Sequence, residues 1–451
     1  MSDSSEADEK APSRASPTPA AERIETLDVL RGLALFGILL INLSAMVMPT
    51  DWFHVAWDDI GPIDTGVEAL KVLFFQGKFY TLFGFLFGVG FALQLSRAED
   101  KGVGFVFRYI WRMLLLLAIG VFHYVVIWDG DILTTYASCG LILLLFMAVK
   151  RLFDWLYRLV TRGRKRRTPR WWVLVGACLF MFGPLALFGG FSWFTYGAKQ
   201  ASLAGEELTT MKQRAVDQLA EISSPKRKAE RAKQDAETLL VHTEGSYPDL
   251  VQHRAKTLPR HLMPVPFWGS FIAIFLLGAY FGRRGFFARA AELRRGFKRL
   301  TIAALVFGLP LTGLFLWVCV AKAGQEMPWW QSTNYILKAT SGLAIALALV
   351  GAVTLGMLGR ARAWLTHLAP IGRMALTNYL LQSVIGTTLI FGYGVGLVGD
   401  IGATAQALIC VVIFGVQIVG SRWWLARYRF GPVEWLWRSA TYLRRQPMRR
   451  D

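Results

Sequence analysis

The chain alternates long apolar runs with short polar connections, and this pattern predicts helices that cross a membrane. Several runs exceed the roughly 18–20 residues that an α-helix needs to span a hydrocarbon core. We predict ten spans, at residues 27–48, 78–96, 104–127, 131–149, 171–195, 264–282, 298–321, 332–358, 370–392 and 402–421. The segment 62–77 is expected to form a short interfacial or re-entrant helix that leads into the second span. The predicted fold class is an all-α polytopic membrane protein with about ten transmembrane helices.

Polar segments divide the chain into five regions. Residues 1–22 are polar and rich in Ser, Ala and Pro, which predicts a disordered tail. They lack the basic start and the cleavage site of a secretory signal, so the first span is expected to be retained. Two membrane halves of five spans each, 23–198 and 261–430, flank the polar loop 199–260. The chain ends in a basic tail, 431–451.

The polar loop 199–260 is long and mixed in charge. Its content of Ala, Glu, Lys and Gln favours one or two exposed helices. The run Ser223, Ser224 and Pro225 predicts a break in this helical stretch.

The basic residues fix the predicted orientation of the spans. The chain has 50 Lys and Arg against 31 Asp and Glu, a formal net charge of +19. Arginine-rich connections such as 150–170 and 282–299 would lie on one side, whereas the basic-poor turns 128–131 and 392–402 would lie on the other. The positive-inside rule then makes both termini cytoplasmic. With this orientation the loop 199–260 is expected on the extracytoplasmic side, and its lysines do not contradict this, because long loops cross largely regardless of charge.

Composition also bears on partners. The positive charge favours anionic lipid headgroups, and without zinc-finger spacing or a separate basic domain we expect no nucleic-acid binding.

The four cysteines show no ligand spacing, and no other spacing predicts a metal site. The sequence contains no P-loop, GxSxG elbow, HExxH or Rossmann fingerprint. A monomer and a homo-oligomer both stay open.

Charged side chains inside predicted spans are candidates for a functional site, because charges in a bilayer are costly. Asp28 and Arg31 open the first span on one helix face, where they could pair or contact a cofactor, and Asn42 lies deeper. An interfacial helix start explains the first two equally well. Lys78 lies near the outer interface at the start of the second span, where snorkelling to the headgroups is the simpler explanation.

The ninth span carries a second polar group. Asn378 and Gln382 lie four residues apart on one helix face, and Arg373 lies near the cytoplasmic entrance. Asn and Gln either line a cavity or hydrogen-bond to a neighbouring helix.

In the second span, Gly84 and Gly88 form a small-residue face for helix packing.

The stretch VFHYVVIWDGDILTTYA, residues 121–137, combines a histidine with carboxylates at the ends of two spans. His123 lies about one turn before the end of the third span, and Asp131 opens the fourth. The tight turn between them makes the spans antiparallel neighbours. A carboxylate on one ring nitrogen fixes the tautomer and supports the other nitrogen as a base. Helix capping explains Asp131 equally well, and a single histidine in an apolar helix is often structural.

Several segments together resemble a known bacterial family. The opening RIETLDVLRGLALFGILLINL is similar to the R-x-x-x-L-D-x-L-R-G segment that begins members of the transmembrane acyltransferase superfamily. The segments GKFYTLFGFLFGVGF, HYVVIWDGDILTTYASCGLI and GRMALTNYLLQS, the last followed by FGPVEWLWRSATY, resemble the YeiB-like family, known as domain of unknown function 418. The resemblance covers nearly the whole chain after residue 22.

The resemblance implies an acyltransferase of the bacterial cytoplasmic (inner) membrane. The superfamily includes the lysosomal heparan-glucosaminide acetyltransferase and the bacterial acyltransferase-3 enzymes. These proteins move an acyl group, typically from cytosolic acyl-CoA, to a hydroxyl or amine across the membrane, and a histidine near the acceptor side is the expected catalytic residue. In acyltransferase-3 proteins that histidine lies in the first span, where this chain has Asn42. Here His123 is the only histidine inside a predicted span.

The leading hypothesis is therefore acyl transfer from cytoplasmic acyl-CoA to an extracytoplasmic hydroxyl or amine of a glycan or small molecule. His123 would act as base or acyl carrier, and Asp131 would orient it. Arginines near the cytoplasmic face would receive the donor's phosphates, although the positive-inside rule explains them too. The predicted substrate- and cofactor-binding residues are Asp28, Arg31, Asn42, Lys78, Arg108, Arg112, Trp128, Tyr136, Arg373, Asn378 and Gln382.

Two other functions stay open. A secondary transporter or exporter of a small metabolite would use His123 and Asp131 as proton-relay residues. Two halves of five spans fit such a protein, but the sequence shows no paired interrupted helices. A non-catalytic partner of another envelope protein would use the loop 199–260. A requirement for an acyl donor distinguishes the first two functions.

Overall fold

The computed structural model describes residues 24–49, 61–100, 106–160, 172–262, 268–321 and 328–450. Within these ranges the regular structure is helical, apart from one isolated bridge between Tyr428 and Arg449. Seven helices of the described chain are long and apolar enough to cross a membrane, and two shorter apolar helices, Leu133–Val149 and Gly269–Arg283, accompany them. The all-α polytopic membrane fold is confirmed. The count of ten spans and the side of the termini stay predictions, and the tail 1–22 lies outside the described residues.

The first half of the chain follows the predicted pattern closely. Its helices are α1 (Glu25–Val47), α2 (Pro62–Phe74), α3 (Phe79–Asp100), α4 (Val106–Phe122), the π-helical turn η2 (His123–Ile127), α5 (Leu133–Val160) and α6 (Trp172–Leu203). The expected short helix before the second span is α2. The predicted fourth span, 131–149, ends where the apolar segment Leu133–Val149 ends, and the helix itself continues to Val160.

The second half contains α10 (Trp268–Arg283), α11 (Arg294–Ala321), α12 (Pro328–Met357), α13 (Arg362–Leu365), η3 (Thr366–Leu368), α14 (Ala369–Arg373), α15 (Ala375–Ile390), α16 (Ala403–Arg427) and α17 (Pro432–Thr441). The single helix predicted over 370–392 is wrong, since α14 ends before α15 begins. The carboxylate of Glu434 in α17 accepts hydrogen bonds from the backbone N–H groups of Leu376 and Thr377, at 2.6 and 3.0 Å. The α15 N-terminus is thus capped by a helix from the segment predicted to be a basic tail.

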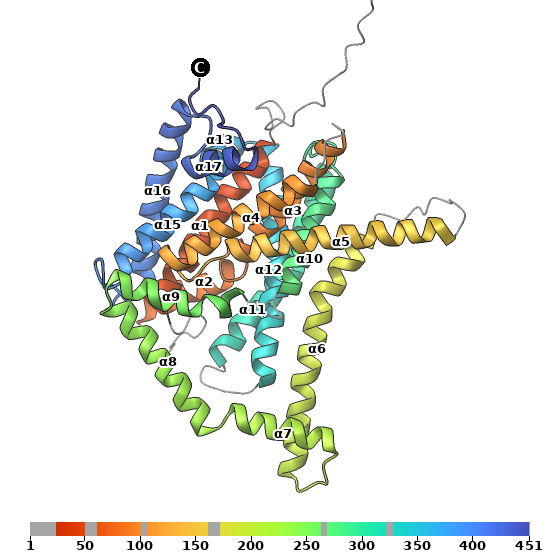
Figure 1. The fold of residues 1–451 in the computed structure, drawn as a ribbon, viewed down its shortest axis with the longest axis vertical. Coiled ribbons are helices and arrows are strands. Elements are labelled where there is room, and N and C mark those ends of the chain that lie inside the picture. The colour runs from red at the N-terminus through yellow and green to blue at the C-terminus, as the bar shows by residue number, and fades with distance from the viewer. Residues whose placement is uncertain are drawn as a thin grey trace, which may run out of the picture.

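The bundle core depends on close helix contacts. In Figure 1, α16 runs along one side of the bundle and α6 along the other, with α1 and α3 between them. A side chain on Gly88 of α3 would overlap the carbonyl of Phe275, and one on Gly278 of α10 would overlap that of Phe85. The two backbones therefore touch at these glycines, which confirms Gly88 as a packing residue.

The polar loop forms three helices rather than one or two: α7 (Thr210–Ile222), α8 (Pro225–Thr243) and α9 (Tyr247–Leu262). The predicted break at Ser223–Pro225 is confirmed. The expected exposure is wrong for α9, which folds back against η2 at one end of the bundle (Figure 1). Leu250 and Arg254 are buried four residues apart on one face of α9.

Candidate functional site

The last turn of α4 is π-helical and carries His123. The N–H of Trp128 donates to the carbonyl of His123, five residues earlier, at 2.8 Å. Such turns are rare and occur often at functional sites. The His123 side chain has no exposed surface, and the buried Trp128 ring meets it edge-on with centroids 6.4 Å apart.

Both ring nitrogens of His123 are hydrogen-bonded. Nδ1 lies 3.0 Å from Oδ1 of Asp131, and Nε2 lies 2.9 Å from Oγ of Ser383. A carboxylate can only accept, so the proton is assigned to Nδ1. The Ser383 hydroxyl is then assigned as donor to Nε2, the shorter of its two contacts, the other being the carbonyl of Tyr379 at 3.2 Å. The three side chains come from η2, the turn 128–132 and α15, and all are buried. We call them the triad.

Asp131 is held rigidly. Its Oδ1 accepts from the N–H of Leu133 at 3.1 Å, and its Oδ2 accepts from the N–H and the hydroxyl of Thr134, at 2.7 and 2.6 Å. Asp131 therefore caps α5 and orients His123 at the same time. The Thr134 hydroxyl donates its proton to Asp131. It therefore accepts a hydrogen bond from Nε2 of His261, 2.9 Å away.

Helix α9 supports the triad from outside. The ring of His261 stacks on Tyr124, with centroids 4.2 Å apart and planes at 28°. The Tyr124 hydroxyl lies 3.0 Å from that of Thr257, and the Tyr247 hydroxyl donates to the carbonyl of Val126 at 2.7 Å. Sequence reasoning missed Ser383 and His261. Their only sequence signal is a polar side chain on a helix face, which many residues share.

The predicted arginines lie at the other end of the bundle, near α17. Arg31 pairs with Asp28 at 2.8 Å, and the Arg112 guanidinium lies 3.8 Å from the Trp437 ring centroid. Arg31 and Arg438 are close enough to Arg112 to repel its charge. Eleven residues of helix separate Arg112 from His123, which is roughly 16 Å along α4.

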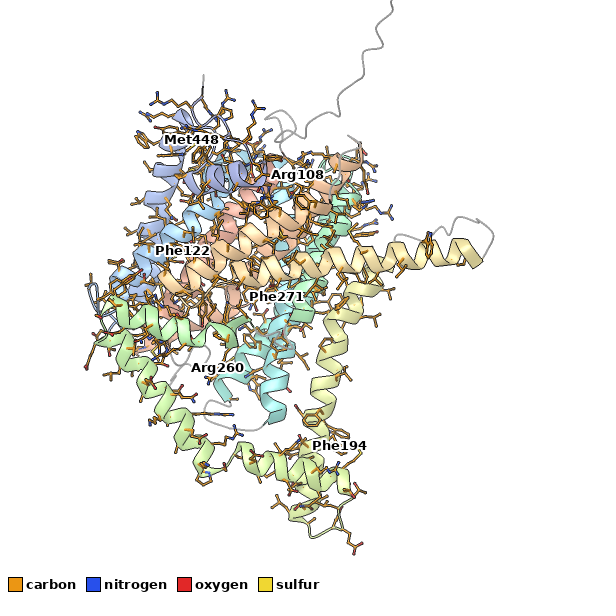
Figure 2. The ribbon with its side chains drawn as sticks, in the orientation of Figure 1. Arg108, Phe122, Phe194, Arg260, Phe271 and Met448 are labelled. Carbon is orange, nitrogen blue, oxygen red and sulfur yellow. The ribbon has the colours of Figure 1, made fainter. Side chains whose placement is uncertain are left out.

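Figure 2 shows the same separation, with Arg108 near the α17 end of the bundle and Phe122 farther along α4. Arg373 ends α14 and is half-buried. The structure thus groups Arg31, Arg112 and Arg438, but it does not bring them to the triad.

Other predicted binding residues have structural partners. Asn378 donates to Ser421 at 3.0 Å and Gln382 to Gln417 at 2.7 Å, so both connect α15 to α16. The Tyr136 hydroxyl donates to the carbonyl of Tyr80 at 2.8 Å. These hydrogen bonds favour the helix-packing interpretation of the polar residues in α15.

The Lys78 side chain is buried inside the bundle. It has no exposed surface, and its ammonium donates to the carbonyl of Val72 at 2.8 Å and lies 5.5 Å from the Phe315 ring centroid. The expected snorkelling is wrong, because the ammonium is bonded to a carbonyl of α2 and does not reach the protein surface. Asn42 is half-buried on α1.

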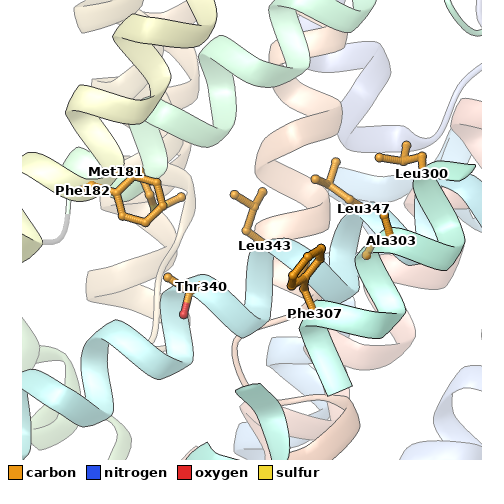
Figure 3. A pocket seen from close by; sticks show the side chains of 10 residues that line it. Met181, Phe182, Leu300, Ala303, Phe307, Thr340, Leu343 and Leu347 are labelled. Atoms are coloured by element: carbon orange, nitrogen blue, oxygen red, sulfur yellow. The ribbon is translucent and has the colours of Figure 1, made fainter. Parts of the chain in front are cut away.

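An apolar cavity of about 280 Å³ lies between α6, α11 and α12. Figure 3 shows Phe182, Phe307 and Leu343 among its walls, and Thr340 is the polar side chain of the lining. None of the lining residues belongs to the triad, so the cavity suits a hydrocarbon chain better than a reacting group. Within the described residues, no group of three or more His, Cys, Asp or Glu is arranged to hold a metal ion.

The fold and the site define an all-α multi-pass membrane protein with a buried Ser–His–Asp triad. Residues 281–444 match the family model described as "Protein of unknown function (DUF418)". The chain is 32% identical to "Uncharacterized protein YxaH" of Bacillus subtilis (strain 168), over 96% of this chain and 97% of the relative. It is 28% identical to "Uncharacterized protein YeiB" of Escherichia coli (strain K12), over 93% of this chain and 96% of the relative. The chain belongs to the DUF418 family. No solved structure matches it.

Proposed function

We propose that the protein is an acyltransferase of the bacterial cytoplasmic membrane, which moves an acyl group from cytoplasmic acyl-CoA to an extracytoplasmic hydroxyl or amine. The observation that carries the proposal is the buried hydrogen-bond chain from Asp131 through His123 to Ser383. The direction of its hydrogen bonds suits general-base catalysis, because Asp131 orients the imidazole and Nε2 can receive a hydroxyl proton. The resemblance to the transmembrane acyltransferases supplies the acyl chemistry.

The hydroxyl at Nε2 is that of Ser383, so we assign the acyl group first to this side chain. In the first step the bond between Ser383 Oγ and the acyl carbon forms while the thioester C–S bond breaks. The Ser383 proton passes to His123 Nε2 and then to the leaving thiolate. In the second step the acceptor oxygen or nitrogen bonds to the acyl carbon, the Ser383 ester bond breaks, and the acceptor proton returns through His123 to Ser383.

The arginines at the α17 end suit the phosphates of the donor. Arg31, Arg112 and Arg438 come from α1, α4 and α17, and the first and last lie close enough to Arg112 to repel its charge. One guanidinium group can donate to two oxygens of the same phosphate. A group of arginines therefore suits a phosphate-rich donor better than single lysines would. The pantetheine arm of CoA carries the thioester away from the phosphates, so the roughly 16 Å of α4 between the cluster and His123 fits this donor.

The acceptor would enter at the α9 end. His123 has no exposed surface, so helix α9 must move before a substrate reaches Nε2. That movement would break the hydrogen bonds of α9 with η2, between Thr257 and Tyr124 and from Tyr247 to Val126, and the contacts of His261 with Tyr124 and Thr134.

The test uses the purified full chain in detergent with radiolabelled acetyl-CoA, a longer acyl-CoA and an envelope extract as acceptor source. Label should stay on the wild-type protein before the extract is added. Ser383→Ala should abolish that label, and His123→Ala should lower transfer by about 10²- to 10⁴-fold. Ser341→Ala is the matched control, because Ser341 is also buried and bonded only to a helix carbonyl in the described structure.

The outcomes separate the parts of the proposal. Full transfer by Ser383→Ala would reject the acyl-serine step but leave His123 as base towards the acceptor. Transfer that is unchanged in His123→Ala, or no transfer from either donor, would reject the acyltransferase.

A proton-coupled transporter is the second candidate, and one observation favours it. The hydrogen-bond chain continues from Asp131 through Thr134 to His261, whose side chain is 20% exposed. Such a chain can relay a proton between the surface and a buried histidine. A transporter would move its substrate into proteoliposomes under a pH gradient without an acyl donor, and Thr134→Val would slow it.

A further inference from the structure

A second buried polar cluster lies beside the triad and takes no part in the proposed transfer. Arg254 of α9 has no exposed surface, and within the described residues none of its three guanidinium nitrogens has a hydrogen-bond partner. His242 at the end of α8 is equally buried, and its Nε2 also has no hydrogen-bond partner in this part of the chain. A buried charge without an acceptor is destabilising, so its presence needs a reason.

Aromatic rings and one carboxylate surround these two side chains. The Phe391 ring centroid lies 5.6 Å from Cζ of Arg254 and 4.7 Å from the His242 ring. Oδ2 of Asp129 is 4.0 Å from Nε2 of His242, which is too long for a hydrogen bond. Burial lowers the pKa of both Arg254 and His242, and the charge of Asp129 opposes this for each. We call Arg254, His242, Phe391 and Asp129 the Arg254 cluster.

The surrounding chain holds the cluster in place. Nδ1 of His242 lies 2.7 Å from the carbonyl of Thr238, so Nδ1 carries the proton and Nε2 faces the cluster. The N–H of Gly392 donates to the carbonyl of His242 at 2.8 Å. A side chain on Gly392 would overlap the carbonyl of Thr243, so glycine permits this close approach.

The Arg254 cluster borders the triad. Asp129 lies two residues before Asp131 in the same turn. Tyr124 lies close enough to Arg254 and to both aspartates to interact electrostatically with all three. Leu250, one turn before Arg254, packs in the same apolar group as Trp128, which meets His123. A ligand at Arg254 would therefore lie near the turn that carries Asp131.

We infer that the Arg254 cluster binds an oxyanion, a phosphate or carboxylate group of the acceptor, and holds the acceptor beside the triad. The planar fork of a guanidinium matches two oxygens of such a group, and His242 adds a donor at Nε2 when it is protonated. The Phe391 ring, 5.6 Å from the guanidinium carbon, is within range of a cation–π interaction with it. The acceptor role rests on the proposed acyl transfer, whereas oxyanion binding does not.

The first experiment measures binding to the purified full chain in an uncharged detergent. The probes are glycerol 3-phosphate as a soluble source and detergent-dissolved phosphatidylglycerol as a lipid source, followed by the melting temperature and by tryptophan fluorescence. Either probe should stabilise the protein saturably. Arg254→Met should weaken that binding by about 10- to 100-fold, because a charged hydrogen-bond partner is lost.

The matched control is Arg260→Met. Arg260 lies on the same helix, as Figure 2 shows, and it is exposed, so the variant removes the same charge and leaves the cluster intact. It should bind the probes as the wild type does. Equal loss in both variants would mean non-specific attraction and would overturn the site. Stabilisation by only one of the two probes would show whether the bound oxyanion belongs to a lipid or to a soluble molecule.

Two further variants distinguish a binding residue from a structural one. Without a probe, Arg254→Met should raise the melting temperature, because it removes an unpaired buried charge; a lower one would mean that Arg254 is structural. Asp129→Asn should tighten probe binding several-fold, because it removes a competing negative charge, and weaker binding would contradict the assignment.

The binding and transfer proposals fail separately. His123→Ala should stop transfer and keep probe binding. Probe binding without any acyl transfer would therefore leave the oxyanion site and remove its acceptor role. Transfer that Arg254→Met leaves unchanged, with no binding of either probe, would overturn the site and leave the acyltransferase.

Discussion

The triad and the Arg254 cluster both contact the turn 128–131, yet they differ in how their hydrogen bonds are completed. In the triad, both nitrogens of His123 and both oxygens of Asp131 have partners at 2.6–3.1 Å. In the Arg254 cluster, the three guanidinium nitrogens and Nε2 of His242 have none within the described residues. Arg254 and His242 are as fully buried as His123, so burial alone does not cause the difference.

The comparison shows two ways in which a buried polar site is prepared for function. A fully paired network is rigid and sets the direction of proton transfer before any substrate arrives. An unpaired cation keeps an unfavourable desolvation energy that only a ligand relieves. We therefore read the triad as the reacting part and the Arg254 cluster as the binding part of one site.

The largest effect should come from Asp131→Ala. It leaves His123, the Thr134 hydroxyl and two backbone N–H groups without their acceptor, which should lower the free energy of unfolding by about 3–5 kcal/mol. Denaturant unfolding in mild detergent measures this. Asp129→Ala, in the same turn, is the control and should cost far less, because the Asp129 side chain is 22% exposed and its carboxylate lies 4.0 Å from Nε2 of His242, too far for a hydrogen bond. Equal costs would remove the distinction between the two clusters.

Thr134→Val should have the next largest effect. The hydroxyl donates to Asp131 and accepts from His261, so its loss takes a partner from the buried Asp131 and from the partly buried His261. We expect a loss of about 1–3 kcal/mol in the free energy of unfolding. Thr312→Val in α11 is the control, since Thr312 is buried but its hydroxyl has no partner in the described residues, and it should cost little. A smaller loss for Thr134→Val than for this control would contradict the network.

The pH dependence of stability should show a smaller effect than the two substitutions above, and we expect it to come from His242 of the Arg254 cluster. Burial holds the pKa of His242 below its unfolded value of about 6.5, with Asp129 opposing and Arg254 and His253 reinforcing the shift. The neutral ring is thus favoured in the folded state. Its contribution is complete above pH 6.5 and is lost as the pH falls towards the folded pKa.

The measurement is the melting temperature from pH 7.5 to pH 5. The wild type should lose more on acidification than His242→Gln, in which the titrating group is gone. Glycerol 3-phosphate should reduce that loss, because an oxyanion favours the protonated ring. Identical pH profiles in the wild type and the variant would exclude His242 as the cause.

The smallest effect should come from the polar contacts between α15 and α16. A double-mutant cycle of Asn378→Leu and Ser421→Ala should give a coupling near 0.6 kcal/mol, as is usual for hydrogen bonds between membrane helices. Acyl transfer should stay within a few-fold of the wild type. A large loss of transfer with a normal melting temperature would instead return Asn378 to the substrate site.

The sequence predicts the local features of this protein well. Apolar runs locate the helices, and the hairpin 121–137 brings His123 to Asp131 because only eight residues separate them. The break at Ser223–Pro225 is equally local. The sequence does not predict the burial of Lys78, since a lysine near a span end normally reaches the headgroups.

Distant contacts decided the rest of the candidate site. Ser383 reaches His123 across 260 residues of sequence, and no local pattern marks it. Asn378 and Gln382 look equally suited to a cavity or to a neighbouring helix, and only the position of α16 assigns them to packing. Arg254 reads as a solvated charge in a polar loop until α9 is placed against η2.

By itself, then, the sequence determined the membrane-spanning helices and the pairing of His123 with Asp131. Hydropathy and short-range geometry act within one helix or one turn, so a single segment suffices to predict them. Only the tertiary structure decided which hydroxyl completes the triad and which cation is buried without a partner. In a membrane protein the lipid-facing and core-facing surfaces are both apolar, so the pattern along a helix does not say which polar residue will meet which neighbour.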